Sequence, residues 1–104
     1  MHGRLARYTF SGDAQELAER AEDGLLPIFQ AQPGFRAYSV IKSDDEIMSF
    51  SAWDSADQAE AANAAAAGWV AENMTDDIVL KEARIGEILF STVLGVSTKA
   101  GATA

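Results

Sequence analysis

The sequence lacks several residues and motifs that would point directly to a class of function. It contains no cysteine, which excludes disulfides, thiolate catalysis and zinc sites that use cysteine. Its one histidine, His2, stands at the amino terminus. There is no calcium-loop spacing, phosphate-binding glycine loop, nucleophile elbow or HExxH motif. We therefore predict neither a metal ion nor a bound cofactor.

Positive charge and long apolar runs are also scarce. Eight Lys and Arg residues stand against 16 Asp and Glu residues, a formal net charge of -8, and the basic residues do not cluster. Nucleic acids and anionic membranes both require a positive patch, so we expect neither as a partner. No apolar run approaches the roughly 20 residues of a membrane span, and the amino terminus lacks the apolar core of a signal peptide. These absences predict a cytoplasmic protein.

What is present predicts one packed domain, because 48% of the 104 residues are apolar. The periodicity of apolar residues predicts strands at 3–11, 35–42 and 46–53, a fourth strand within 78–94, and helices at 13–31 and from about 55 to 74. This β-α-β-β-α-β order is typical of a ferredoxin-like α+β fold, an antiparallel sheet with two helices on one face. We expect the domain to span residues 1–94 and residues 95–104 to form a flexible tail.

Both faces of the predicted sheet carry apolar side chains. In the third strand Met48 and Phe50 share one side and Ile47 and Trp53 the other; in the fourth strand, Ile78 is expected opposite Ile85. A bare face of four strands covers on the order of 400 Å², near the largest apolar patch of a typical monomer, roughly 300 to 600 Å². We therefore predict a homodimer whose two sheets form an α/β barrel, with an arm at 86–94 that crosses to the partner. A break or bulge is expected at Gly86. The alternative is a monomer with a mixed outer face.

An asparagine stands in the middle of the alanine-rich helix, AEAANAAAAGWVAENM. A helical wheel places Asn63 on one apolar stripe with Ala59, Ala67 and Val70. A polar side chain there either has its amide satisfied by hydrogen bonds or lines a cavity. Trp69 lies off this stripe, where it either packs at the boundary or forms a wall of the pocket mouth.

Two further side chains are candidates for polar contacts to a ligand. Tyr8 has a hydroxyl that could donate to, or deprotonate, a bound phenol, and its structural alternative is core packing. Arg84 could stabilise a phenolate, and its structural alternative is pairing with Glu82 or Glu87.

Three residues of the third strand are candidates for lining a substrate pocket. Ser49 and Ser51 share a strand face with Trp53 and give that face a polar streak. Contact with solvent or with the interior of a dimer would explain the two serines equally well. For Trp53, packing in the core is the alternative.

Residues from Arg4 to about Phe90 resemble the antibiotic biosynthesis monooxygenase-like proteins of the dimeric α/β-barrel superfamily. The resemblance rests on ARYTFSGDAQEL, on PGF before the second strand, and on SFSAWDSADQAEA. It implies a homodimer with one pocket in each subunit, between the sheet and the two helices. In the cofactor-free members the substrate is a polycyclic phenol or hydroquinone whose own anion reduces oxygen, in a dry cavity with polar contacts.

The sequence departs from this family in part. A histidine is common on the second helix of the family, where this chain has Ala62 and Asn63. The haem-degrading branch uses a helix histidine as the iron ligand, beside a strand asparagine and a helix tryptophan. Trp69 could match that tryptophan, but Tyr8 stands where the asparagine is expected. Haem degradation is therefore disfavoured.

These observations predict a cofactor-independent monooxygenase acting on a small aromatic or quinol-type molecule. The predicted catalytic residues are Asn63, Trp69, Tyr8 and Arg84, and the predicted pocket residues are Trp53, Ser49 and Ser51. The alternative is a non-catalytic homodimer that binds a small apolar ligand or has a stress-related role. The lack of a group that titrates near neutral pH in the expected pocket favours this alternative.

Overall fold

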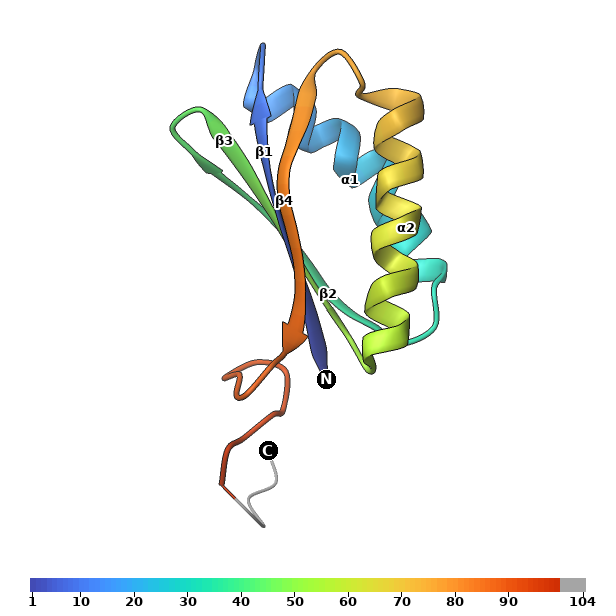
Figure 1. Ribbon diagram of the computed structural model, residues 1–104, viewed down its shortest axis with the longest axis vertical. Coiled ribbons are helices and arrows are strands. Elements are labelled where there is room, and N and C mark those ends of the chain that lie inside the picture. Colours follow the sequence, from blue (N-terminus) through green and yellow to red (C-terminus); the bar gives the residue numbers. More distant parts are fainter. Residues whose placement is uncertain (100–104) are drawn as a thin grey trace.

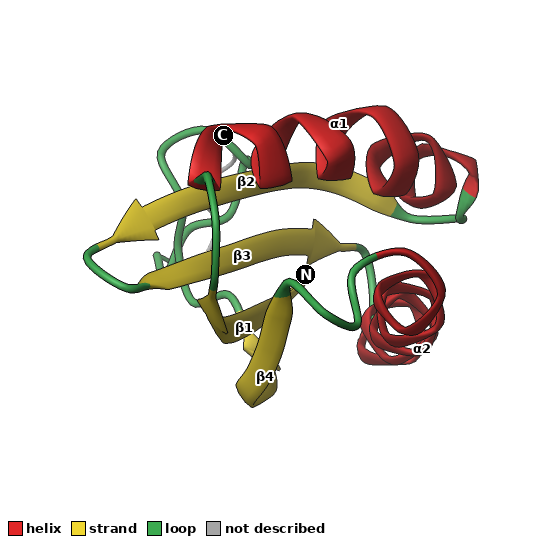
Figure 2. Ribbon diagram, turned by 90° about the horizontal axis from the view of Figure 1, so that it is seen from above, coloured by secondary structure: helices red, strands yellow, loops and turns green. Residues whose placement is uncertain are grey.

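A four-stranded antiparallel sheet in the order β2-β3-β1-β4 forms one layer of the molecule. The computed structural model describes residues 1–99. Its elements are β1 (His2–Phe10), α1 (Ala14–Ala31), β2 (Phe35–Ser43), β3 (Glu46–Trp53), α2 (Ala56–Asn73) and β4 (Ile78–Glu87) (Figure 1). Both helices cover the same side of the sheet, and the other side carries no helix (Figure 2). The predicted ferredoxin-like α+β fold is confirmed; the two-chain barrel stays a prediction.

Side-chain caps fix where the helices begin. The Asp13 carboxylate accepts a hydrogen bond from the Gln15 amide at 3.0 Å, as an N-cap side chain does. In α2 the cap is Ser55, whose hydroxyl accepts from the Gln58 amide at 3.2 Å. Each cap satisfies an amide at a helix start that has no partner within the helix.

The PGF segment that links α1 to β2 depends on its glycine. Gly34 has φ +81°, in the left-handed region that favours glycine, and its carbonyl accepts from the Asp54 amide at 3.0 Å. A Cβ at Gly34 would lie 1.9 Å from Gln58 Oε1. This glycine therefore lets the chain turn while lying close to the first turn of α2.

Aromatic rings fill the core between α1 and the sheet. Trp53 and Phe29 are fully buried, and their ring centroids are 5.3 Å apart in an edge-to-face arrangement. In α1, Leu17, Ala21 and Leu25 are buried together with Phe29, whereas Ile28 is only partly buried.

The buried stripe of α2 consists of alanines. Ala59, Ala62 and Ala66 are fully buried against the sheet, while Ala67 is exposed and Asn63 lies at the edge of the contact. The predicted stripe centred on Asn63 is therefore wrong. A helix with alanine on most sides gives little contrast between its faces, so the wheel alone could not fix its rotation.

A β-bulge in β4 changes which residues face the helices. Arg7 pairs with Glu82 but Tyr8 pairs with Leu80, so Lys81 is the extra residue. As a result Ile78 and Ile85 both pack toward the helices, although an odd number of positions separates them. The prediction that they lie on opposite faces is wrong. The bulge lies near the middle of β4 and not at Gly86.

Beyond β4 the chain leaves the end of the sheet (Figure 1). The Ile88 amide donates to the Met1 carbonyl at 2.9 Å, and the side chains of Leu89, Phe90 and Val93 are exposed. Of the predicted tail, 95–99 are described, and 100–104 lie outside the described residues. Within residues 1–99, neither helix has the length and apolar character needed to cross a membrane.

Candidate functional site

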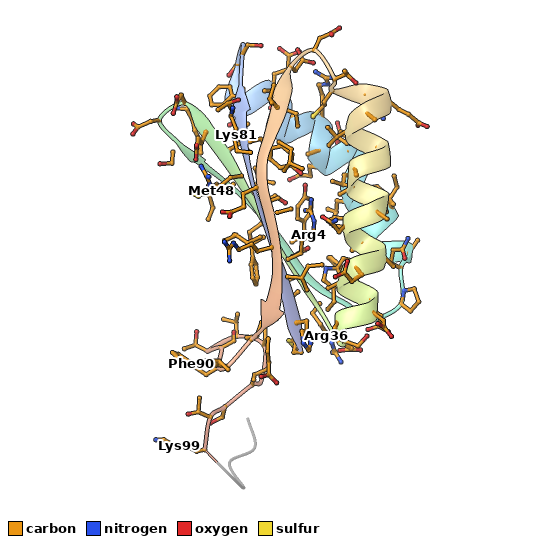
Figure 3. All side chains as sticks on the ribbon, viewed as in Figure 1. Arg4, Arg36, Met48, Lys81, Phe90 and Lys99 are labelled. Carbon is orange, nitrogen blue, oxygen red and sulfur yellow. The ribbon has the colours of Figure 1, made fainter. Side chains whose placement is uncertain are left out.

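A buried arginine joins the sheet to α2. Arg4 is only 2% exposed and lies on the helix side of β1 (Figure 3). Its Nε donates to Asn63 Oδ1 at 2.7 Å, and its Nη2 donates to the Tyr8 hydroxyl at 3.1 Å. Its Nη1 is buried and has no hydrogen-bond partner among residues 1–99. The amide oxygen of Asn63 is thus satisfied, whereas the guanidinium of Arg4 is not.

Arg4 differs from the other arginines in having no acidic partner. Within residues 1–99, the four remaining arginines each form an ion pair: Arg7 with Glu46, Arg20 with Asp77, Arg36 with Asp54, and Arg84 with Glu82. These pairs are all at least partly exposed, and the one arginine that is deeply buried has only neutral acceptors. A buried charge without a counter-ion is costly for stability, so Arg4 is a candidate functional residue.

A small cavity of about 40 Å³ lies between the two helices and the sheet. Its walls are mainly apolar side chains, including Leu17, Leu25 and Met74. The polar groups in the wall are the hydroxyls of Tyr8, Tyr38 and Ser49, which come from three adjacent strands. The Ser49 hydroxyl is buried and makes no hydrogen bond to the described residues. The volume is far below the roughly 300 Å³ at which ligand pockets begin.

Tyr38 is the side chain of this cavity with a clearly altered acidity. The pKa of Tyr38 is raised to about 12, chiefly by burial and also by the neighbouring Tyr8, while the positive charge of Arg4 acts in the opposite direction. Its ring packs edge-to-face on Phe29 with centroids 4.9 Å apart. At neutral pH the Tyr38 phenol therefore stays protonated and can donate a hydrogen bond into the cavity.

Trp69 forms the wall of the cavity where the two helices meet. A Cβ at Gly24 of α1 would lie 2.6 Å from the Trp69 ring, so the absence of a side chain at Gly24 lets the indole lie directly on α1. This close approach explains why a glycine stands inside a helix, where it otherwise costs about 1 kcal/mol relative to alanine.

A second hollow, of about 190 Å³, lies between α2 and β4 and is lined by Glu60, Asn63, Ala83 and Ile85. Asn63 lines this hollow, and Tyr8 lines the cavity. Arg4 bonds to both of these residues and pairs with Ile85 in the sheet. The guanidinium lines neither space itself but connects a residue of the hollow, Asn63, to a residue of the cavity, Tyr8.

Comparison with protein families gives one match over this region. The model of the antibiotic biosynthesis monooxygenase family matches residues 1–67, which include β1, β3, Asn63 and the helix-capping segments. The chain belongs to the antibiotic biosynthesis monooxygenase family. The resemblance inferred from the sequence is thereby confirmed. Comparison with curated proteins gives no match.

Several solved structures share this fold. SnoaB, a cofactor-independent oxygenase from Streptomyces nogalater, is 18% identical over 88% of this chain and 96% of its own, with a TM-score of 0.68. An antibiotic biosynthesis monooxygenase-type protein from Nitrosomonas europaea is 16% identical over 86% and 100%, with a TM-score of 0.67. MupZ from Pseudomonas fluorescens is 8% identical over 81% of this chain, which spans 65% of MupZ, with a TM-score of 0.67. At such identities these likenesses show the fold alone.

In this member of the antibiotic biosynthesis monooxygenase family, the structure brings together some of the predicted site residues. Tyr8 and Ser49 line the cavity, and Trp69 forms its wall between the helices. Asn63 does not line the cavity, but Arg4 donates hydrogen bonds to both Asn63 and Tyr8. Trp53 and Ser51 are fully buried in the core and bond to each other, with Trp53 Nε1 donating to Ser51 Oγ at 2.9 Å. Neither lines the cavity.

Arg84 lies elsewhere. It pairs with Leu5 across the sheet, on the face that has no helix, and its Nε donates to Glu82 Oε2 at 2.9 Å. Its side chain is 78% exposed. The placement of Arg84 in the cavity is therefore wrong, because the bulge and the strand alternation direct it to the outer face.

The sequence reasoning missed Arg4 and Tyr38. Arg4 is separated from Tyr8 by an even number of positions in the same strand, so the alternation that turns Tyr8 inward turns Arg4 inward too. A charged residue on an inward strand position was the available signal.

Within residues 1–99 there is no group of three His, Cys, Asp or Glu side chains that could hold a metal ion.

Proposed function

We propose that this chain is a cofactor-independent monooxygenase that oxidises a small aromatic or quinol-type molecule with O2. The observation that carries the proposal is a buried cation, hydrogen-bonded to Asn63 and Tyr8, beside an apolar cavity in a chain of this family. Such an environment favours an electron-rich anion of the substrate and excludes water.

The reaction needs no reductant other than the substrate. When a ring CH2 beside a phenol becomes a carbonyl, one atom of O2 enters the product as the new C=O oxygen. The other oxygen atom leaves as water with the two hydrogens of the CH2 group, so atoms and electrons balance. In this scheme Arg4 provides positive potential, and Tyr8 and Tyr38 provide hydroxyls that contact the substrate oxygen.

A ring system requires more room than the cavity of about 40 Å³ provides. We therefore propose that the substrate enters between α1 and α2, and that the Trp69 indole on Gly24 is the group that moves.

Oxygen uptake above the uncatalysed rate, with anthrone and with a naphthohydroquinone, tests the activity. We expect turnover in the wild type, a decrease of at least about tenfold in Asn63→Ala, and unchanged turnover in Glu72→Gln, an exposed position of the same helix. With anthrone and labelled O2, one labelled atom should enter each product molecule as the new carbonyl oxygen; with the naphthohydroquinone, one labelled atom should enter as a ring hydroxyl of a hydroxynaphthoquinone, with the other leaving as water. No turnover with either substrate would contradict the proposal.

A second candidate function is non-catalytic binding of a small apolar ligand. The small cavity volume favours it, as does the high pKa of Tyr38, which makes this phenol a poor base at neutral pH. Binding of an anthrone-type ligand without oxygen uptake would support this candidate over the oxygenase.

We also propose that two copies associate through the face of the sheet that has no helix. Leu5 and Ile41 are about half exposed there, and the register places them beside Phe50 and Met48. Figure 3 shows Met48 directed away from the helices. The exposed Leu89, Phe90 and Val93 of the 86–94 arm provide further apolar surface for the partner.

A further inference from the structure

We propose that Arg4 is the binding group for an anionic oxygen of the ligand, supplied by an aromatic carboxylate or a phenolate. The ligand would accept a hydrogen bond from the free Nη1 and neutralise the guanidinium. The inference deepens the proposed function by assigning a charge to the substrate class. It concerns binding and can be tested without turnover.

One nitrogen of the Arg4 guanidinium lacks a hydrogen-bond partner within residues 1–99. Arg4 Nη1 is buried in a side chain that is only 2% exposed, and no atom of residues 1–99 accepts its hydrogens. Buried polar groups normally have a hydrogen-bond partner, and buried charges are normally paired. Every other arginine of the described chain is paired with a carboxylate, so the composition does not lack acids. An anion from outside the chain would complete the site.

Two hydrogen bonds hold the guanidinium of Arg4 in a fixed orientation. The bonds from Nε to Asn63 and from Nη2 to Tyr8 fix the plane of the guanidinium from two sides. A carboxylate or phenolate oxygen on the remaining nitrogen would form a charge-assisted hydrogen bond, which is stronger than a neutral one. Because Arg4 bonds to Asn63, which lines the hollow of about 190 Å³, the ring attached to that oxygen can extend into the hollow; extension into the cavity requires the proposed movement of Trp69.

Glu60 is the acidic residue in the wall of the neighbouring hollow. It is exposed and forms no ion pair with Arg4 in the described structure. We infer that it does not serve as the counter-ion. Glu60→Gln should then bind an aromatic carboxylate with affinity within about twofold of the wild type; a tightening of about tenfold would show that Glu60 occupies Arg4 and would overturn the proposal.

The direct test compares benzoate with benzamide, its neutral analogue, by calorimetric titration of the wild type. We expect benzoate to bind at least about tenfold more tightly, because only the carboxylate carries the charge. Equal affinities would overturn the proposal. Titration with 4-nitrophenol distinguishes the phenolate source, because growth of the yellow phenolate band on binding reports capture as the anion.

Two variants test the residue. Arg4→Met should remove the preference for benzoate over benzamide. If Arg4→Met does not fold, Asn63→Asp keeps Arg4 and supplies a carboxylate within hydrogen-bond distance of its Nε. We expect this variant to bind benzoate at least about tenfold more weakly and to unfold at a higher temperature. Wild-type affinity in Asn63→Asp would overturn the proposal.

The outcomes separate this inference from the proposed oxygenase function. Selective benzoate binding without oxidation of any quinol would sustain the role of Arg4 and remove the oxygenase. Quinol oxidation with equal rates in the wild type and Arg4→Met would sustain the oxygenase and overturn the role of Arg4.

Discussion

Arg4 Nε donates a hydrogen bond to Asn63 Oδ1 across the contact between α2 and the sheet, although the two residues are 59 positions apart in the sequence. The apolar surroundings make this bond strong, and they make the free Nη1 of Arg4 costly in the absence of a ligand. The structural role of Asn63 on α2 is therefore set by Arg4, a strand residue that the helix covers.

Tyr38 leads to a prediction about stability at high pH. Its folded-state pKa of about 12 exceeds the ordinary value of 10.0, so the protonated phenol is favoured in the folded protein. Its contribution to stability is complete below pH 10 and is lost as the pH rises from about 10 to about 12, by about 1 kcal/mol at about pH 11. Urea unfolding at a series of pH values measures this loss. Tyr38→Phe is the control, and a variant with the same decline as the wild type would contradict the prediction.

Three of the predicted catalytic residues, Asn63, Trp69 and Tyr8, lie at or beside the cavity, but Arg84 does not. Periodicity within one element tells which side chains turn inward, so it could identify Tyr8. It cannot tell which inward residues of different elements meet. The partnership of Arg4 with Asn63 was therefore beyond the sequence alone.

The contact between Gly24 of α1 and Trp69 of α2 predicts that Gly24→Ala destabilises the protein when Trp69 is present and stabilises it when Trp69 is absent. Gly24→Ala places a Cβ 2.6 Å from the Trp69 ring, and overpacking of this kind costs about 1 to 3 kcal/mol. In a Trp69→Ala background the clash is absent, and the same substitution should stabilise by about 1 kcal/mol through helix propensity. Urea unfolding of the four proteins of this double-mutant cycle measures the coupling. Additive effects would show that the indole does not rest on Gly24.

The alanine stripe of α2 gives a second prediction at the scale of an element. Ala62 is fully buried against the sheet, whereas Ala61 beside it is exposed. Ala62→Leu should lower the free energy of unfolding by about 1 to 3 kcal/mol because the helix must move away from the sheet. Ala61→Leu should change it by less than about 0.5 kcal/mol. Equal effects of the two substitutions would contradict the observed rotation of α2.

For the whole molecule, the face of the sheet without helices gives a prediction about association. We expect sedimentation at micromolar concentration to show a dimer, and Ile41→Lys to shift it toward monomer, because a charge at this half-exposed position would be desolvated in the interface. The variant should remain folded by circular dichroism. Glu72→Lys, on the exposed side of α2, should leave the dimer intact. A wild type that sediments only as monomer would remove the proposed barrel.

The sequence by itself determined the order of strands and helices and the family, because these depend on residues that are near one another along the chain. Only the tertiary structure decided the rotation of α2, the bulge at Lys81 and the burial of Arg4 without an acid. The physical reason is that an alanine-rich helix has no strongly preferred face and a strand can absorb one extra residue, so packing against other elements selects among arrangements that local preferences leave nearly equal in energy.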